Sequence, residues 1–378
     1  MRHHVRGARV SGIESVLVVG TGLIGTSIAL ALREQGVTVF LDDCDAAAVR
    51  LARELGAGVE WPAEGSPDTA SGVAPDTIVD IAVIAVPPHV VADRLAGLQR
   101  AGAARFYTDV ASVKALPLQQ AAALGCDLTT YVAGHPLAGR ERSGPAAARA
   151  DLFLGRPWAL CPTEETSPEA VEVLRGLIKL CGGEAVEVEA AEHDRAVAII
   201  SHAPHVAASA VAARLADASA TALGLAGQGV RDVTRIAAGD PGLWTGILSG
   251  NALPVAEVLE AVAADLAAAA AALRASSDPA AMGGVTELLH RGVAGTGRIP
   301  GKHGGPARVY ATVQVIIGDR PGELARLFQV AEAAGVNIED VRLEHAPGLP
   351  LGAADLSVQP EAVAALSEAL RAHGWHLP

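Results

Sequence analysis

Short runs of β-branched and other apolar residues alternate with amphipathic helical patterns over the first half of the chain. Such runs are typical of buried strands, and segments such as 46–55 and 168–180 repeat apolar residues at helical spacing. Strands that alternate with helices in this way predict an α/β fold with a doubly wound sheet. The predicted strands are residues 16–19, 38–41, 81–86, 106–109, 130–133, 158–161 and 185–188.

The pattern changes near residue 190. From about residue 192 to 274 strand signals are absent and alanine-rich helical segments dominate, which predicts an all-helical domain. A stretch rich in Gly, Pro and basic residues around residue 295 is typical of an exposed linker. The tail follows the order β-α-β-β-α with a short or missing last strand, which predicts a small ferredoxin-like α+β sheet. The predicted organisation is a flexible N-terminus (1–14), an α/β domain (15–190), a helical domain (191–290), a linker (291–307) and an α+β domain (308–378).

Length and composition limit the class of protein. The 378 residues are half apolar, 3% aromatic and carry a net charge of −13, so we expect two or three folded domains and no nucleic-acid partner. The four cysteines lie far apart, with no CxxC pair and no histidine at zinc-ligand spacing, which indicates reduced thiols and no metal. The N-terminus lacks the apolar segment of a signal peptide, and apolar runs elsewhere are interrupted well before the ~20 residues of a membrane span. We therefore expect a cytoplasmic protein without a membrane partner.

Glycine is concentrated directly after the first predicted strand. Gly20, Gly22 and Gly25 form a GxGxxG pattern at the mouth of a helix that begins with Leu23 and Ile24. The first glycine permits a tight turn, the second removes a side chain where a pyrophosphate approaches backbone N–H groups, and the third lets the helix pack on its strand. Between a strand and a helix, the pattern predicts dinucleotide binding in a Rossmann-type domain, in preference to a merely structural turn.

Two carboxylates, Asp42 and Asp43, lie at the end of the next predicted strand. A carboxylate at this place accepts hydrogen bonds from the adenosine ribose and repels a 2′-phosphate. The following residue is Cys44, where an NADP-binding protein would be expected to carry an arginine. The acidic pair therefore favours NAD as the cofactor.

Two further strands end in small or polar residues. Ligands of open α/β sheets bind beyond the carboxyl ends of the strands, so we predict that Pro87, Ser112 and Lys114 border the nicotinamide pocket. The structural alternative for Ser112 is that its side chain only caps a helix.

His135 lies among residues too small to fill a core, in the stretch AGHPLAG that follows another strand. A lone histidine is more often structural than catalytic, but these small neighbours and the charged segment RERSG favour a chemical role. Oxidation of an alcohol by hydride transfer requires removal of the hydroxyl proton, and imidazole titrates near neutral pH. His135 is therefore the predicted general base.

The helical domain contributes a second polar group. His202 and His205 lie three residues apart on one helix face, but no third ligand is near enough to favour a metal site. Arg231 and Arg235 are four residues apart and could hold a substrate carboxylate through bidentate hydrogen bonds. The alternative is that Asp232 satisfies one of these arginines structurally.

Five motifs in this order resemble the prephenate dehydrogenase family over residues 16 to about 274. They are GTGLIG (20–25), DVASVK (109–114), GHPLAG (134–139), HDRAVAIISHAPH (193–205) and RDVTRIAAGDPGLW (231–244). The tail at 316–344 resembles an ACT domain, the amino-acid-sensing module attached to some of these enzymes. Ala111 and Leu137 replace a glycine and a methionine that are frequent in the family, and both changes are conservative.

The resemblance implies an NAD-dependent oxidoreductase of tyrosine biosynthesis. In this family NAD takes a hydride from the alcohol carbon of prephenate, carbon dioxide leaves, and the ring becomes aromatic. The resemblance assigns the catalytic histidine to His135 and the alcohol-contacting serine to Ser112. The substrate-binding residues are Arg235, His205, Glu141, Asp232 and Trp244 by resemblance, together with the pocket residue Lys114.

The ACT-like tail suggests regulation. Gly322 and the helix after it offer backbone N–H groups for the carboxylate of an amino acid, and Asn337 and Ile338 open the next strand. We expect tyrosine as the effector and a homodimer held by the helical domain, which also binds substrate. The alternative is that the turn at 321–322 is structural and that the tail only helps dimerisation.

Two other functions stay open at this point. Nothing in the sequence separates a prephenate dehydrogenase from an arogenate dehydrogenase, whose substrate carries an amino acid side chain in place of a keto acid. A dinucleotide-binding sensor without turnover is the remoter alternative, and the presence of His135, Ser112 and Arg235 argues against it.

Overall fold

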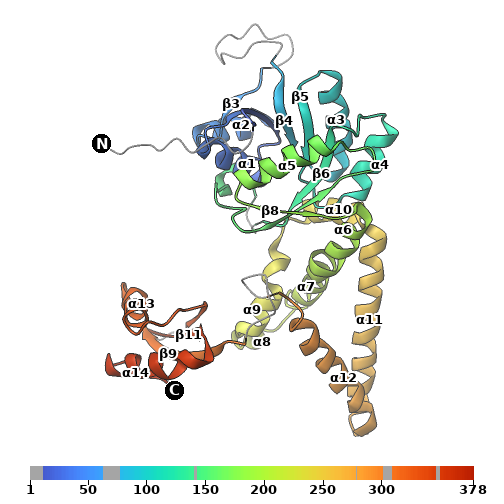
Figure 1. Cartoon of the computed structure of the whole chain (residues 1–378). Helices are drawn as coiled ribbons and strands as arrows, with labels where there is room; N and C mark the ends of the chain where they lie inside the picture. Colours follow the sequence, from blue (N-terminus) through green and yellow to red (C-terminus); the bar gives the residue numbers. More distant parts are fainter. Residues whose placement is uncertain (1–11, 63–76, 140–142, 278, 301–308, 346–349) are drawn as a thin grey trace, which may run out of the picture. The chain divides into compact units, whose positions relative to one another are not determined.

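The computed structural model describes residues 12–62, 77–139, 143–277, 279–300, 309–345 and 350–378. The chain divides into two compact units, Met1–Ala263 and Ala264–Pro378. The first unit contains a large sheet and several helices, and the second contains the end of one long helix, a further helix and a small C-terminal sheet (Figure 1). Of the predicted N-terminal segment 1–14, only residues 12–14 belong to the described part.

The first unit is built on an eight-stranded sheet with the strand order β3-β2-β1-β4-β5-β6-β7-β8. All neighbouring strands are parallel except β6 and β7, whose described connection contains no α-helix that could carry a parallel crossover. Every predicted strand is present, and the additional β3 has two exposed residues and therefore no pattern to predict it. The strands are β1 (Ser15–Val19), β2 (Thr38–Asp42), β3 (Val59–Glu60), β4 (Val79–Ile84), β5 (Ala104–Asp109), β6 (Tyr131–Pro136), β7 (Pro157–Cys161) and β8 (Glu184–Glu187).

Helices cover both faces of this sheet, as a doubly wound fold requires. Successive side chains of β1 point to opposite faces, so Val16 and Val18 pack in one core with residues of α1, α2 and α5. Leu17 and Val19 pack in a second core with residues of α3 and α4. The helices are α1 (Leu23–Glu34), α2 (Ala46–Glu54), α3 (Val91–Arg100), α4 (Ala115–Ala123) and α5 (Pro168–Leu180).

A continuous helical run follows β8, made of α6 (Ala190–Val197), the π-helical turn η4 (Ala198–His202) and α7 (Ala203–Ala213). The π turn precedes Pro204, which has no backbone N–H and cannot continue a regular α-helical hydrogen-bond pattern. By length and composition this run could cross a membrane, contrary to the expectation that every apolar run is too short. Core helices pass the same test, and four polar side chains of this one, His193, Asp194, His202 and His205, are buried.

Short helices follow this run, and two long helices, α11 and α12, come after them. Arg291 of α12 pairs with Asp265 of α11 at 2.8 Å, and α12 continues to residue 296. The linker predicted at 291–307 therefore begins inside a helix, because glycines at exposed helical positions weaken a helix without ending it. The elements are α8 (Ala220–Gly224), α9 (Gln228–Thr234), η5 (Arg235–Ala238), α10 (Pro241–Gly250), α11 (Ala252–Arg274) and α12 (Pro279–Thr296).

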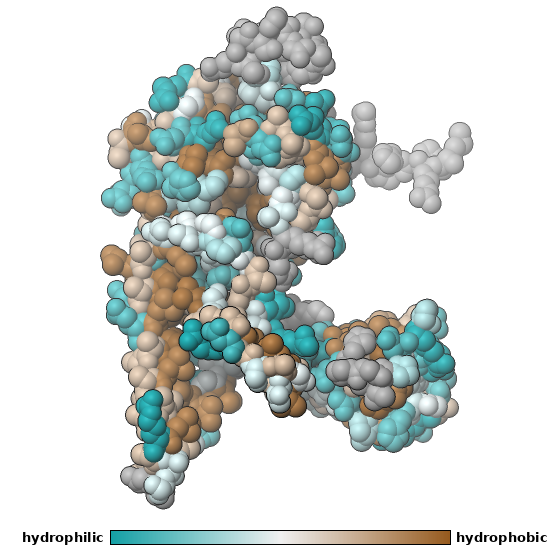
Figure 2. Space-filling view, turned by 180° about the vertical axis from the view of Figure 1, so that it is seen from behind, coloured by the Kyte–Doolittle hydropathy of each residue, from teal (hydrophilic) through white to brown (hydrophobic). Residues whose placement is uncertain are grey.

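Large apolar side chains are exposed along α11 and α12 (Figure 2). Leu253 and Leu266 of α11 are 79% and 62% exposed, and Leu289 and Val293 of α12 are 65% and 74% exposed. Single exposed leucines are ordinary, but several large apolar side chains on two helices joined by an ion pair are typical of an interaction surface.

The C-terminal sheet has the strand order β10-β11-β9, with all pairs antiparallel. Its core includes Val315 of β9, Leu327 of α13 and Leu366 of α14. The predicted last strand is reduced to a single bridge between Ile316 and His376, so the small α+β sheet forms as the pattern predicts. The elements are β9 (Ala311–Gly318), α13 (Glu323–Ala333), β10 (Asp340–His345), β11 (Leu351–Val358), η6 (Pro360–Ala362) and α14 (Val363–Ala372).

Candidate active site

The turn between β1 and α1 is closed by backbone packing. Gly20 has a φ of +103°, and its N–H donates to the carbonyl oxygen of Asp42 at 2.8 Å. A Cβ at Gly20 would lie 2.2 Å from the Ala85 carbonyl oxygen, and a Cβ at Gly25 would lie 1.9 Å from that of Gly20. A Cβ at Gly22 would meet nothing within 4 Å, and no described side chain caps the helix that begins there. The fold thus requires Gly20 and Gly25, whereas Gly22 leaves the N-terminus of α1 open to a pyrophosphate.

The two carboxylates at the end of β2 differ in environment. The carboxylate of Asp43 accepts hydrogen bonds from the Thr21 N–H at 2.6 Å, the Thr21 hydroxyl at 3.0 Å and the Asp45 N–H at 2.9 Å. Burial acts to raise the pKa of Asp43, but these hydrogen bonds outweigh it and lower the pKa. Burial raises the pKa of Asp42, against the opposing charge of Arg94. Asp43 is therefore the carboxylate that holds the glycine turn, beside the expected position of the ribose.

A buried ion pair lies beneath the ends of β5 and β6. The Lys114 ammonium pairs with the Asp109 carboxylate and donates to the Gly134 carbonyl oxygen at 2.5 Å. The Tyr131 hydroxyl donates to the other oxygen of Asp109 at 2.6 Å. The Lys114 side chain has no exposed surface, and its assignment to the substrate pocket stays a prediction. The site needs Lys114 to hold two strand ends together, and a buried charge persists only when it is paired in this way.

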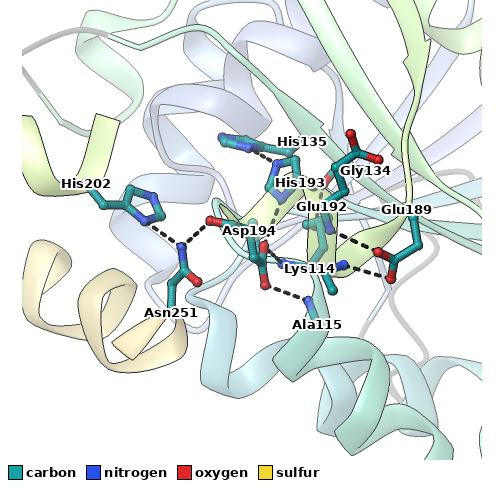
Figure 3. Close-up of polar contacts among 12 residues, drawn as sticks. Lys114, Ala115, Gly134, His135, Glu189, Glu192, His193, Asp194, His202 and Asn251 are labelled. Carbon is teal, nitrogen blue, oxygen red and sulfur yellow. Dashed lines mark hydrogen bonds and ion pairs between the residues drawn. The ribbon is translucent and has the colours of Figure 1, made fainter. Parts of the chain in front are cut away.

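His135, in β6, is the first of three side chains in a hydrogen-bonded row (Figure 3). Its Nδ1 lies 2.9 Å from Nε2 of His193, and Nδ1 of His193 lies 2.8 Å from a carboxylate oxygen of Asp194. The Asp194 carboxylate also accepts the backbone N–H groups of Lys114 at 2.8 Å and of Ala115 at 2.9 Å. Sequence reasoning assigned no role to His193 or Asp194, although both begin the motif HDRAVAIISHAPH.

The surroundings of His135 keep its ring uncharged. Its pKa lies well below the ordinary value because of burial first, then the charge of Lys114, and then the neighbouring rings of His193 and His202. An imidazole with a depressed pKa is in its proton-accepting form at neutral pH.

The Asn251 amide and the ring of His202 lie next to this row, and a stacked pair of rings follows in the same domain. The Asn251 side-chain amide donates to the Asp194 carbonyl oxygen at 2.7 Å and lies 3.1 Å from Nδ1 of His202. His205 stacks on Trp244, with ring centroids 3.6 Å apart and an interplanar angle of 12°, so the structure brings these two predicted residues together. The part of the chain that the structure describes holds no group of three or more His, Cys, Asp or Glu side chains able to bind a metal ion.

Two family profiles and a relative that covers nearly the whole chain identify its family. The family profile described as "Prephenate dehydrogenase, nucleotide-binding domain" matches residues 28–187, and "Prephenate dehydrogenase, dimerization domain" matches residues 189–287. The probable prephenate dehydrogenase NovF of Streptomyces niveus is 41% identical over 370 residues, which cover 96% of this chain and 99% of that protein. The chain belongs to the prephenate dehydrogenase family.

Other members of the prephenate dehydrogenase family resemble the catalytic part. The prephenate dehydrogenase of Bacillus subtilis is 32% identical over 243 residues, covering 63% of this chain and 64% of that one. The structure of arogenate dehydrogenase from Synechocystis matches at 27% identity with a TM-score of 0.58, covering 75% of this chain and 98% of that one. For the fold alone, the A. aeolicus prephenate dehydrogenase solved with hydroxyphenyl propionate and NAD+ has a TM-score of 0.63, at 24% identity and with coverages of 75% and 99%.

The other residues that the family resemblance assigned to the substrate lie on the helical segment or outside the described part. Arg235 is the first residue of η5 and is exposed. Asp232 on α9 is exposed and accepts a hydrogen bond from the Gln228 amide at 2.8 Å. Glu141 lies outside the described residues, so its assignment stays a prediction.

The remaining predicted residues follow the carboxyl ends of the strands, as expected for an open α/β sheet. Pro87 is the N-cap of the short helix η2 (Pro88–Val90) after β4. Ser112 is half-buried in the loop between β5 and α4, and Lys114, not Ser112, is the N-cap residue of α4. Leu23 and Ile24 open α1 and are half-buried.

The predicted regulatory residues lie at two separate hollows of the C-terminal sheet domain. Gly322, with a φ of +86°, lines a hollow of about 330 Å³ together with Arg320. Asn337 and Ile338 line another hollow of about 450 Å³, and the Asn337 amide donates to the Glu339 carboxylate at 2.7 Å. Neither of these two hollows contains all three predicted residues.

The glycine turn yields a test with a matched control. Gly25→Ala places a Cβ against the Gly20 carbonyl oxygen, so we expect a lower melting temperature and a loss of NAD binding together. Gly22→Ala meets no chain atom, so we expect an unchanged melting temperature and NAD affinity at least ~10-fold weaker, because the methyl group occupies the pyrophosphate site. Thermal unfolding and NAD titration measure both effects. Unaltered NAD affinity in Gly22→Ala would show that the cofactor does not use this turn.

Proposed function

We propose that the chain is an NAD-dependent prephenate dehydrogenase, which converts prephenate and NAD to 4-hydroxyphenylpyruvate, carbon dioxide and NADH in tyrosine biosynthesis. The observation that carries the proposal is the state of His135, in a chain that belongs to this family. Burial, and next the Lys114 charge, lower its pKa, so its ring is uncharged at neutral pH and able to accept the proton of an alcohol.

The glycine turn and the acidic end of β2 support NAD as the cofactor. Asp42 and Asp43 place negative charge where NADP would place its 2′-phosphate, and Cys44 provides no countercharge. The residues proposed to hold NAD are Gly20, Gly22, Leu23, Ile24, Gly25, Asp42, Asp43 and Pro87. When bound, NAD supplies the two-electron acceptor for oxidation of the alcohol carbon.

The chain's own part in the reaction is to bind, orient and move one proton. His135 takes the hydroxyl proton as the C–H electron pair leaves the alcohol carbon, and Ser112 orients the hydroxyl. The resulting carbonyl is conjugated through the ring to the carbon that bears the carboxylate. The C–C bond then breaks, carbon dioxide leaves, and its electron pair makes the ring aromatic. The former alcohol oxygen, now a phenolate, takes the proton back from His135, so no net proton is released.

The substrate side of the site combines a cation with flat rings. The Arg235 guanidinium suits a carboxylate, and the stack of His205 on Trp244 suits a planar ring or its edge. We assign Arg235 to binding and not to the bond-breaking step, because stabilising a carboxylate that must leave would slow its loss. Asp232 and Glu141 complete the proposed substrate contacts.

Arogenate dehydrogenase is the second candidate function. The observation that favours it is the match to the Synechocystis arogenate dehydrogenase structure, at 27% identity over 75% of this chain. The 41% identity to the probable prephenate dehydrogenase NovF, over nearly the whole chain, supports prephenate as the first choice.

A comparison of the two substrates tests the proposed function. NADH formation by the purified protein should show a higher kcat/KM for prephenate than for arogenate.

In His135→Asn, kcat should fall by about 100-fold or more while NAD affinity is retained, because a general base contributes on this scale. Since the pKa of His135 is depressed, the wild-type kcat should stay constant down through pH ~6.5 and fall only in more acidic buffer. A better rate with arogenate would support the second candidate, and near-normal kcat in His135→Asn would refute the assigned base.

Arg235→Gln separates binding from chemistry. We expect KM for prephenate to rise by roughly 10-fold or more with a much smaller change in kcat, because the guanidinium holds a carboxylate equally in ground and transition states. Steady-state kinetics at saturating NAD measures both constants. A large fall in kcat with unchanged KM would place Arg235 in the transition state instead.

Assembly and location follow from the surface and the family. We propose a homodimer through the exposed apolar residues of α11 and α12, since the family profile that covers residues 189–287 is described as a dimerization domain. A cytoplasmic location is consistent with a biosynthetic enzyme in which the one membrane-length helical run of the described residues carries buried polar side chains.

The C-terminal domain is proposed as an ACT-like sensor of tyrosine. Its first hollow lies at the N-terminus of α13, where Gly322 and the first-turn N–H groups suit the carboxylate of an amino acid. Similarity to NovF extends over 96% of the chain and so includes part of this domain. Tyrosine would then act by favouring a less active arrangement of the chain.

Removal of the tail from near residue 305 tests this regulation. The truncated protein should keep dehydrogenase activity and lose inhibition by tyrosine, which in the full chain should weaken substrate use by roughly 5- to 150-fold. The measurement is kcat/KM for prephenate with and without tyrosine, in both proteins. Equal inhibition in both would assign tyrosine to the active site as a product-like competitor.

A further inference from the structure

We propose that His193 and Asp194 form a positioning pair that fixes the proton of His135 on Nδ1, leaves its Nε2 bare as the base, and balances the charge His135 gains from substrate. The inference rests on the proposed function, because it concerns the same proton transfer. Neither residue is predicted to contact substrate or cofactor. Both act through His135, whose ring is the only member of the row assigned to the reacting atoms.

The direction of each hydrogen bond follows from the far end of the row. The Asp194 carboxylate accepts two backbone N–H groups, one on each oxygen, from Lys114 at 2.8 Å and Ala115 at 2.9 Å. An ionised carboxylate only accepts, so Nδ1 of His193 must donate across the 2.8 Å separation. An uncharged His193 then has a lone pair on Nε2. The contact at 2.9 Å is therefore donated by Nδ1 of His135.

The pair is held in place from several elements. His193 and Asp194 are each 3% exposed, so water does not compete for their hydrogen bonds. The Asp194 carboxylate accepts a backbone N–H at the N-terminus of α4. The backbone carbonyl oxygen of Asp194 accepts a hydrogen bond from the Asn251 side-chain amide at 2.7 Å (Figure 3). The His193 ring meets that of His135 nearly edge-on, at an interplanar angle of 75°. A ring held on both nitrogens cannot rotate without breaking a buried hydrogen bond.

The row also stabilises the positive charge that His135 gains in the reaction. When His135 accepts the substrate proton, its ring becomes a cation next to the Lys114 ammonium and close to the rings of His193 and His202. The Asp194 carboxylate is the anion at the far end of the hydrogen-bonded row, and it draws positive charge along the row through His193. The proton itself goes to Nε2 and later returns to the product oxygen, so the Nδ1 hydrogen bond persists through both steps.

Replacement of His193 by two side chains provides the test. His193→Leu cannot accept a hydrogen bond, so we expect kcat to fall about 10- to 100-fold, with KM and NAD affinity within ~3-fold of wild type. His193→Gln offers an amide oxygen to Nδ1 of His135, so it should recover a substantial part of kcat. As a matched control, Cys181→Ala removes another buried side chain outside this row and should lower the melting temperature without lowering kcat.

Nitrogen NMR of 15N-histidine-labelled protein reads the tautomer directly. In the wild type, His135 should show a protonated Nδ1 and a bare Nε2, the pattern should persist in His193→Gln, and it should be lost in His193→Leu. A wild-type spectrum with the proton on Nε2 overturns the proposal even if no variant folds. An unchanged tautomer in His193→Leu, or an equal loss of kcat in Cys181→Ala, overturns it as well. If the wild type oxidises neither prephenate nor arogenate, the proposed function fails, and the spectra still decide the pair.

Discussion

The buried ion pair between Lys114 and Asp109 is the interaction on which the edge of the active site depends. Neither side chain has exposed surface, and loss of one partner from such a pair typically costs about 3–5 kcal/mol. The Tyr131 hydroxyl and the Gly134 carbonyl oxygen satisfy the remaining polar groups. A Cβ at Gly134 would lie 2.9 Å from the Asp109 carbonyl oxygen, so the two strand ends can only approach this closely at a glycine. His135 follows directly and inherits its position from this contact.

The same ion pair sets the chemistry of the base. Burial and the Lys114 cation make His135 a weak base, and therefore its protonated form is a strong acid. A base that releases its proton readily suits a reaction in which His135 takes one proton from an alcohol and later returns it to a phenolate. Asp194, reached through His193, limits the effect by placing an anion at the other end of the hydrogen-bonded row. The site thus tunes one histidine with a cation on one side and a distant anion on the other.

Much of the fold and the backbone geometry of the glycine turn could be predicted from the sequence, because both depend on local backbone properties. The strands of the large sheet follow from runs of β-branched residues that are buried on both faces. The roles of Gly20 and Gly25 follow from spacing alone, since a strand-turn-helix leaves no room for a Cβ at these positions. The order of elements in the C-terminal domain is predictable for the same reason, down to its reduced last strand.

By itself, then, the sequence determined the family, the nucleotide-binding turn and His135 as the candidate base. Only the tertiary structure decided that Lys114 lies in a buried ion pair with Asp109, and that β7 runs antiparallel to β6. It also decided that His135 meets His193, 58 residues further along the chain. The physical reason is that local propensity and spacing act over a few residues, whereas a buried charge finds its partner, and an imidazole its tautomer, only when distant segments pack together and exclude water.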